Sequence, residues 1–170
     1  MLSFDIRSLE SKAVSVDDEL RPDDPVWQEG DPVPSGPVHV TGRLSSAGQG
    51  RFYWHGQIEG DLRLPCRRCL ADACAHITDD VHLIFAEEGS DETDDPDVYT
   101  LDPRARELDL RPALREQWLL CVPSYVLCQE DCKGLCPTCG AELNAGPCDC
   151  PDAGDARWDA LRKLDSKSNS

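Results

Sequence analysis

Six of the chain's ten cysteines lie within 23 residues, in a pattern that can bind a metal ion. They are Cys128, Cys132, Cys136, Cys139, Cys148 and Cys150. The central Cys136-Pro-Thr-Cys139 has the form of a zinc knuckle, a turn that directs two thiolates at one metal. Pro137 fixes φ early in this turn, and Gly140 can adopt the positive φ that brings backbone N–H groups toward sulfur. The spacing therefore predicts one zinc ion.

Zinc takes four ligands, so six cysteines leave the ligand set open. We expect Cys136 and Cys139 to be the first two ligands. The other two are expected from the flanking pairs, either Cys128 or Cys132 and either Cys148 or Cys150. In an extended Cys-x-Cys segment the two side chains point to opposite faces, so only one of the last pair faces the metal unless the backbone turns.

This zinc ion is expected to be structural. The segment 128–150 has almost no hydrophobic side chains beyond Leu135 and Leu143, so it cannot form a core of its own. Metal binding must supply its folding free energy, on the order of 10 kcal/mol for a structural zinc ion. Four protein thiolates leave no coordination position for water or a substrate, which excludes a catalytic centre.

A second Cys-x-x-Cys motif, Cys66-Arg-Arg-Cys69, lies in the first half of the chain with Cys74 nearby. A redox pair would need the motif to open a helix, but the residues that follow predict a turn and a strand. A second zinc site would need two more ligands from elsewhere in the chain. We favour the third interpretation, a structural turn in which the arginines are the functional residues.

Arginines form two groups in the sequence. Arg63, Arg67 and Arg68 are the densest basic group of the first half, and Arg111 and Arg115 lie at the start of an expected helix. If that helix packs across the sheet, all five could form one positive patch that contacts RNA phosphates. The alternative is that they are solvated arginines paired with nearby acidic side chains.

The chain is strongly acidic, with 33 Asp and Glu against 17 Lys and Arg and a net charge of −16. Such a charge disfavours non-specific binding to nucleic acid or membranes and favours basic protein partners. The N-terminal residues lack the basic and apolar regions of a signal peptide, and no apolar run approaches the roughly 20 residues of a membrane span. We therefore expect a reduced, cytoplasmic protein with zinc rather than disulfides.

Nothing in the sequence predicts an enzyme or a small-molecule substrate. There is no Ser/His/Asp order, phosphate-binding glycine loop or paired-carboxylate signature. The histidines at positions 39, 55, 76 and 82 fall within expected strands at wide spacing, so we do not expect them to bind metal.

The hydrophobic pattern predicts an α+β fold. Alternating apolar residues predict an antiparallel sheet or partly closed barrel, with a loop over residues 20–37 and an acidic loop over 86–97. One long helix over 108–122 is expected to pack on the sheet and to complete a domain of residues 1–122. Residues 123–164 would form the zinc-stabilised C-terminal segment, which ends in a short helix, and 165–170 a loose tail.

The chain resembles the YceD-like family over residues 37–164. The resemblance rests on several motifs: Leu64-Pro-Cys-Arg-Arg-Cys-Leu70, the acidic loop into Asp97-Val-Tyr99, Leu108-Asp-Leu110, Pro123, Leu127-Cys-Gln-Glu-Asp-Cys-Lys-Gly-Leu-Cys-Pro-Thr-Cys-Gly140, Leu143-Asn144, Cys148-Asp-Cys150 and Asp155-Ala-Arg-Trp158 through Leu164. Ala156 stands where the family pattern has proline. These are bacterial and plastid proteins described as promoting accumulation of large-subunit (23S) ribosomal RNA.

The resemblance implies a non-enzymatic ribosome biogenesis factor. Its partner would be large-subunit rRNA or a pre-ribosomal particle, touched by the arginines, or a basic ribosomal protein for which this chain is an acidic adaptor. In bacteria, family genes commonly adjoin the gene of a small zinc-ribbon ribosomal protein, which suggests a shared pathway. The alternative function is a thiol redox or metal-responsive sensor that uses Cys66 and Cys69.

Overall fold

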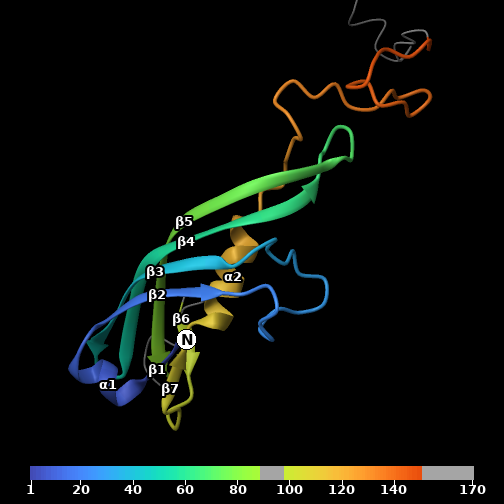
Figure 1. The fold of residues 1–170 in the computed structure, drawn as a ribbon. Coiled ribbons are helices and arrows are strands. Elements are labelled where there is room, and N and C mark those ends of the chain that lie inside the picture. The colour runs from blue at the N-terminus through green and yellow to red at the C-terminus, as the bar shows by residue number, and fades with distance from the viewer. Residues whose placement is uncertain (89–97, 151–170) are drawn as a thin grey trace, which may run out of the picture.

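The computed structural model describes residues 1–88 and 98–150. Most of the regular secondary structure in this part of the chain is β-sheet (Figure 1). The main sheet has the strand order β2-β3-β4-β5-β6. Its strands are β2 (Val14–Leu20), β3 (Val38–Gly48), β4 (Arg51–Pro65), β5 (Asp72–Glu87) and β6 (Val98–Leu101). The first four pair antiparallel, as the alternating pattern predicted, whereas β6 runs parallel to β5.

The sheets are open, so the expected partly closed barrel is not confirmed. The main sheet ends in β2 on one side and β6 on the other. A separate two-stranded sheet pairs β1 (Ser3–Asp5) with β7 (Glu107–Asp109). A short helix, α1 (Ile6–Ser11), follows β1, and its first turn is capped by the Asp5 carboxylate, which accepts the Ser8 backbone N–H at 2.8 Å.

The expected helix over 108–122 is shorter than predicted. Helix α2 (Arg111–Cys121) has 11 residues and begins three positions later than predicted. Leu108 and Asp109 belong to β7 instead, because they pair with Phe4 and Ser3 of β1. The long-range pairing partner was not visible in the local helix pattern. Among the described residues, no helix is long and apolar enough to cross a membrane.

One hydrophobic core lies between the main sheet and α2. The inward-facing residues of β3, β4 and β5 are buried, and α2 contributes Ala113, Leu114 and Trp118. Trp118 is fully buried, and its indole N–H donates to the Pro32 carbonyl at 2.9 Å. The loop between β2 and β3 is therefore fixed against the helix.

Two facing glycines allow β3 and β4 to approach each other closely. Gly42 of β3 pairs with Gly56 of β4, and a Cβ built on Gly42 would lie 2.7 Å from the Gly56 Cα. A Cβ on Gly56 would lie 2.6 Å from the ring of Trp54. The ring of Trp54 thus occupies space that any side chain at position 56 would need.

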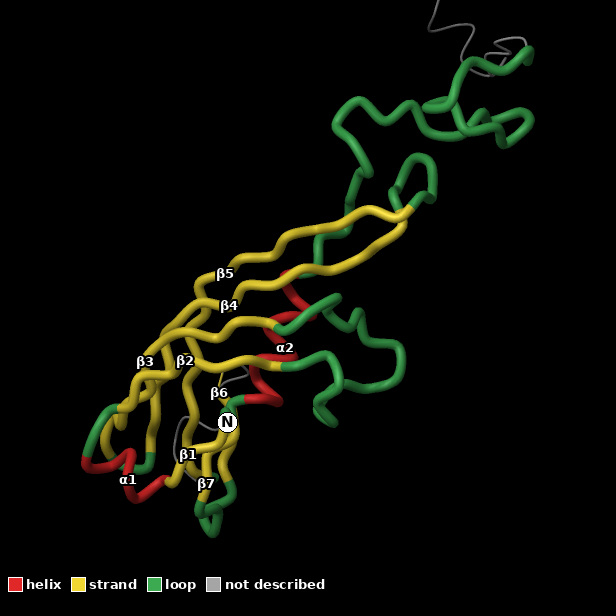
Figure 2. Tube along the Cα trace, viewed as in Figure 1, coloured by secondary structure: helices red, strands yellow, loops and turns green. Residues whose placement is uncertain are grey.

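Beyond the end of β3, β4 and β5 leave the other strands and extend as a two-stranded arm (Figure 1). Pairing between β3 and β4 ends at His39–Glu59, whereas pairing of β4 with β5 continues to Pro65–Asp72. The loop 66–71 forms the tip of the arm. The C-terminal segment 122–150, which consists of loops and turns, lies at the same end of the molecule (Figure 2).

Some predicted elements lie outside the described residues. These are most of the acidic loop 86–97, the short C-terminal helix and the tail 165–170. Residues 86 and 87 belong to the end of β5.

Candidate metal centre

Eight of the ten cysteines form two groups of four, where the sequence had predicted one site. The first group, here called the inner cluster, is Cys66, Cys69, Cys128 and Cys132. The second group, here called the outer cluster, is Cys136, Cys139, Cys148 and Cys150. In each cluster all four sulfur atoms lie within 4.8 Å of one another. The expectation of a single zinc ion was wrong in number because Cys66 and Cys69 join the two cysteines that the sequence had offered to the C-terminal site.

The inner cluster has the dimensions of a tetrahedral zinc site. Four sulfurs at the zinc–sulfur bond length of about 2.3 Å are separated from one another by about 3.8 Å. The Sγ atoms of Cys66 and Cys132 are 3.7 Å apart, and those of Cys69 and Cys128 are 3.5 Å apart. All four thiols are free, and a disulfide would need sulfurs about 2 Å apart. The donor set therefore fits zinc better than it fits a pair of disulfides.

The two Cys-x-x-Cys turns share one backbone geometry. In each, the first cysteine's carbonyl accepts the N–H four residues later at 2.9 Å, from Leu70 or Gly140. The first cysteine's own N–H donates to the carbonyl five residues later at 2.8 Å, on Ala71 or Ala141. Leu70 has φ 63° and Gly140 has φ 74°. The Cys66 turn therefore has the backbone geometry of a zinc knuckle, with leucine at the position where glycine is usual.

Backbone amides in both knuckles stabilise a thiolate. Burial alone raises the pKa of Cys66, but the backbone N–H groups of Cys69, Arg68 and Cys128 outweigh burial and lower the pKa to about 6. The N–H groups of Cys139 and Thr138 likewise lower the pKa of Cys136 to about 6. Each cluster therefore contains at least one thiol that ionises readily.

The other thiols of each cluster cannot all ionise beside these thiolates without a cation. The hydrogen bond with Cys69, together with burial, raises the pKa of Cys128 to about 12. The hydrogen bond with Cys139, together with burial, raises the pKa of Cys150 to about 12. Four sulfurs that crowd together in this way form a site whose charge a divalent cation would balance.

The C-terminal segment is fixed to the arm around the inner cluster. The Arg67 N–H donates to the Val126 carbonyl at 2.9 Å, and the Leu135 N–H donates to the Arg68 carbonyl at 3.2 Å. A small second core joins the two sides. It consists of Cys66, Cys69, Ala73, Ala75, Val126 and Cys132. The inner cluster therefore lies within a packed joint between two segments that are far apart in the sequence.

Two of the predicted RNA-contacting arginines belong to this joint. The Arg67 side chain donates to the Ser124 carbonyl at 3.0 Å. The Arg68 side chain donates to the Cys132 carbonyl at 2.8 Å and to the Tyr125 hydroxyl at 3.1 Å. Arg63, on the exposed face of β4, makes no hydrogen bond or ion pair with any residue that the structure describes.

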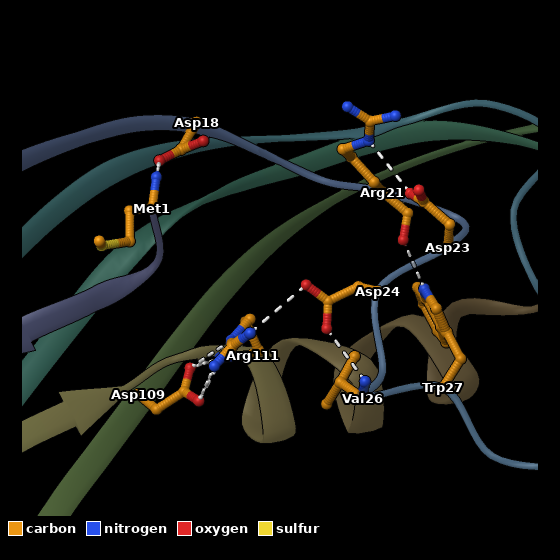
Figure 3. Close-up of polar contacts among 9 residues, drawn as sticks. All are labelled: Met1, Asp18, Arg21, Asp23, Asp24, Val26, Trp27, Asp109 and Arg111. Carbon is orange, nitrogen blue, oxygen red and sulfur yellow. Dashed lines mark hydrogen bonds and ion pairs between the residues drawn. The ribbon is translucent and has the colours of Figure 1, made fainter.

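The other two predicted arginines lie on α2 and pair with acids, as the alternative interpretation required. Arg111 binds the Asp109 carboxylate at 2.7 Å and lies 3.5 Å from Asp24 (Figure 3). Arg115 binds Asp31 at 2.6 Å, and this hydrogen bond lowers the pKa of Asp31. The five arginines therefore form two groups, one at the arm tip and one on the helix, and the helix group is already neutralised.

Cys74 and Cys121 belong to neither cluster. Cys74 is exposed on β5. The Cys121 thiol donates to the Asp79 carboxylate at 3.1 Å, and burial together with this carboxylate raises the pKa of Cys121 to about 12. His76, one of the four histidines predicted not to bind metal, lies 2.9 Å from the Asp61 carboxylate.

The sequence predicted six of the eight clustered cysteines as ligands and treated the Cys66 pair separately. A usable signal was present, because eight cysteines in two Cys-x-x-Cys motifs plus two further pairs are enough for two zinc ions. The second site was not favoured because its two remaining ligands, Cys128 and Cys132, had been assigned to the C-terminal site.

Comparison with known proteins finds a matching family and two similar proteins. Residues 54–165 match the family described as "Large ribosomal RNA subunit accumulation protein YceD". An uncharacterized protein of Bacillus subtilis (strain 168), YlbN, is 28% identical over 130 residues, which are 75% of this chain and 74% of YlbN. The chloroplastic large ribosomal RNA subunit accumulation protein YCED homolog 1 of Arabidopsis thaliana is 38% identical over 48 residues, which are 28% of this chain and 15% of that protein. No solved structure matches the chain.

The family match begins in β4 and spans the arm, α2 and both cysteine clusters, and it covers well over half of the chain. The chain therefore belongs to the YceD family.

Proposed function

We propose that this protein is a non-enzymatic, cytoplasmic factor that promotes accumulation of large-subunit ribosomal RNA. The observation that carries the proposal is the family match, because it includes the arm and both cysteine clusters. The chloroplast relative bears the same description in its name. Neither cluster has an open coordination position once four thiolates bind a metal, which supports a structural role for the site.

The direct test is genetic. Cells that lack this protein should contain less large-subunit rRNA relative to small-subunit rRNA, and the wild-type gene should restore the ratio. A normal ratio in the depleted cells would overturn the proposal. A variant with all eight clustered cysteines replaced by serine serves as the control for the site, since it should fail to restore the ratio although its β-sheet remains.

We further propose that each cluster holds one zinc ion. Zinc supplies the cross-link that keeps the loop-rich segment 122–150 folded on the arm. Elemental analysis of the purified protein should give two zinc ions per chain. One ion, or none, would contradict this assignment.

The surface charge favours a basic ribosomal protein as the direct partner. In the segment 122–150, four exposed acids, Glu130, Asp131, Glu142 and Asp149, stand against Lys133 alone. Two ions that are each bound by four thiolates would add further negative charge. Four of the five candidate RNA-contacting arginines already bind acceptors within the protein.

Affinity purification with and without ribonuclease distinguishes a protein partner from RNA. Retention of a basic ribosomal protein after ribonuclease treatment is expected, and retention should decline as salt increases. The charge-reversal variant Glu130→Lys/Asp131→Lys should capture less of that protein, while Arg63→Glu serves as the matched control on the arm. Capture that requires RNA and is lost in Arg63→Glu would instead support rRNA contact through the arm.

The sensor alternative receives less support from the geometry. Cys66 and Cys69 lie in a turn followed by β5, and they do not open a helix. Thiol trapping in cells should find both cysteines reduced and protected by metal. Reversible oxidation of this pair would favour the sensor.

A further inference from the structure

We infer that Asn144 couples the two clusters: it is a positioning residue for the inner metal ion, and the outer cluster holds it in place. The inference rests on the proposed zinc binding and concerns a side chain that the ligand set does not include. Asn144 is half-buried and lies on the loop between Cys139 and Cys148 of the outer cluster.

The contacts of Asn144 point to the inner cluster. Its side-chain nitrogen donates to the Sγ atom of Cys132 at 3.3 Å. Its side-chain oxygen accepts the Lys133 backbone N–H at 2.8 Å and the Gln129 side-chain amide at 3.3 Å. Asn144 therefore contacts a ligand and two residues of the inner cluster's loop, although its neighbours in sequence belong to the outer cluster.

The orientation of the Asn144 amide follows from these contacts. The Lys133 backbone N–H can only donate a hydrogen bond, so the Asn144 oxygen must face it. That choice places the Asn144 NH₂ group against the Cys132 sulfur. An N–H donor stabilises negative charge on a metal-bound thiolate and fixes its direction, and loss of such outer-shell contacts typically costs 10–100-fold in metal affinity.

The outer cluster determines where Asn144 lies. Eight residues separate Cys139 from Cys148, and Leu143 is the only large hydrophobic residue among them. The loop is joined to the inner side by the Leu135–Glu142 bridge and by the Leu143 N–H, which donates to the Gly134 carbonyl at 2.9 Å. So few contacts cannot order a loop against its conformational entropy, and closure by a metal ion in the outer cluster must contribute.

Coupling between the two ions follows from this arrangement. Loss of the outer ion releases the loop, which withdraws the Asn144 N–H from Cys132 and weakens the inner site. Because linkage is reciprocal, the inner ion strengthens the outer site by the same factor.

A double-mutant cycle on the full-length zinc-loaded protein tests this coupling. Asn144→Asp keeps an oxygen for the Lys133 N–H and replaces the donor facing Cys132 by an acceptor. Cys139→Ser/Cys148→Ser removes the outer site. Stepwise competition with a chromophoric chelator measures the affinity of each ion that a variant binds. Glu142→Gln, which changes the charge of the same loop without touching sulfur, is the matched control.

The expected result is a 10–100-fold loss of inner-site affinity in each of the two variants and no further loss in their combination. Glu142→Gln should retain the wild-type affinity. Unchanged inner-site affinity in Asn144→Asp, or losses that multiply in the combined variant, would overturn the coupling. If Asn144→Asp fails to fold, Asn144→Ala provides the same comparison, since it removes the donor without adding charge.

The outcomes separate this inference from the zinc proposal. Wild-type protein without two zinc ions would overturn the metal assignment itself. Wild-type protein with two ions whose affinities are independent would leave the metal assignment intact and remove the role of Asn144.

Discussion

The two clusters use the same knuckle in different structural settings. The inner cluster joins cysteines that are up to 66 positions apart, and three of its members are at most 6% exposed. The outer cluster takes all four cysteines from 15 consecutive residues, and only Cys136 is buried. The inner cluster links two segments of the fold, whereas the outer cluster closes a local loop.

This difference determines how much each metal ion contributes to the stability of the fold. A cross-link stabilises more when it closes a longer stretch of unfolded chain. The Cys69–Cys128 pair closes 59 positions of chain and the Cys139–Cys148 pair closes 9. Loop entropy alone makes the longer closure more stabilising by about 1.7 kcal/mol. The inner site adds the packing of Val126 and the hydrogen bonds of Arg67 and Arg68, which the outer site lacks.

The largest expected effect comes from breaking the inner cluster. Cys66→Ser removes one of its four ligands, and a structural zinc ion contributes on the order of 10 kcal/mol. The segment 122–150 should leave the arm while the β-sheet remains folded. Elemental analysis should show loss of zinc, and limited proteolysis should cleave this segment rapidly.

Cys74→Ser is the matched control for this experiment, because Cys74 is exposed and belongs to neither cluster. It should leave zinc content and protease resistance unchanged. A Cys66→Ser protein with two zinc ions would show that the inner cluster is not the ligand set.

A smaller effect is expected from breaking the outer cluster. Cys139→Ser should lose the outer ion and expose the loop 136–150 to hydrogen exchange, while amides of the arm keep their protection. Hydrogen exchange resolved by peptide measures both regions in one experiment. Loss of protection in residues 122–135 as large as in Cys66→Ser would contradict the distinction between the two sites.

A milder test removes the polar contacts of the joint and leaves its sulfurs in place. Arg68→Ala deletes hydrogen bonds to the Cys132 carbonyl and the Tyr125 hydroxyl, which should weaken docking by about 1–3 kcal/mol. The amides of residues 124–135 should then exchange faster while both zinc ions stay bound. Arg63→Ala is the control, and equal effects of the two variants would show that the joint does not depend on Arg68.

The sequence revealed the outer knuckle but not how the cysteines divide between two sites. Only one of Cys148 and Cys150 was expected to face the metal, whereas the structure brings both into the outer cluster. The motif Cys136-Pro-Thr-Cys139-Gly140 predicts a knuckle because proline and glycine occupy the positions that the knuckle backbone requires. The Cys66 knuckle has arginines and a leucine in the corresponding positions, and its partner cysteines lie about 60 residues away. Local spacing carries no information about a metal ligand that tertiary folding brings close from a distant part of the sequence.

The same limit applies to the fold. Alternation in β3, β4 and β5 predicted antiparallel strands because burial on one face leaves a direct pattern. The predicted start of α2 was wrong at Leu108, because pairing with Phe4 overrides the helix pattern there. The predicted arginine patch likewise omitted the loop acid Asp31, which binds Arg115 across 84 positions.

The clusters are most alike in their proton chemistry, although the hydrogen bond from Asn144 also lowers the pKa of Cys132 in the inner cluster. In each metal-free cluster one thiol has a pKa of about 6, Cys66 or Cys136, and one has a pKa of about 12, Cys128 or Cys150. At pH 7 the first is ionised and the second is protonated, so metal binding must displace protons from both sites. Zinc affinity should therefore rise with pH above 7 and fall steeply below 6, where the low-pKa thiolate also takes up a proton.

Calorimetry of zinc binding in buffers of different ionisation enthalpy counts the protons released. The variant Cys66→Ser isolates the outer site, and Cys139→Ser isolates the inner site. Both sites are expected to release protons at pH 7, and a site that releases none would contradict the pKa pattern that the two clusters share.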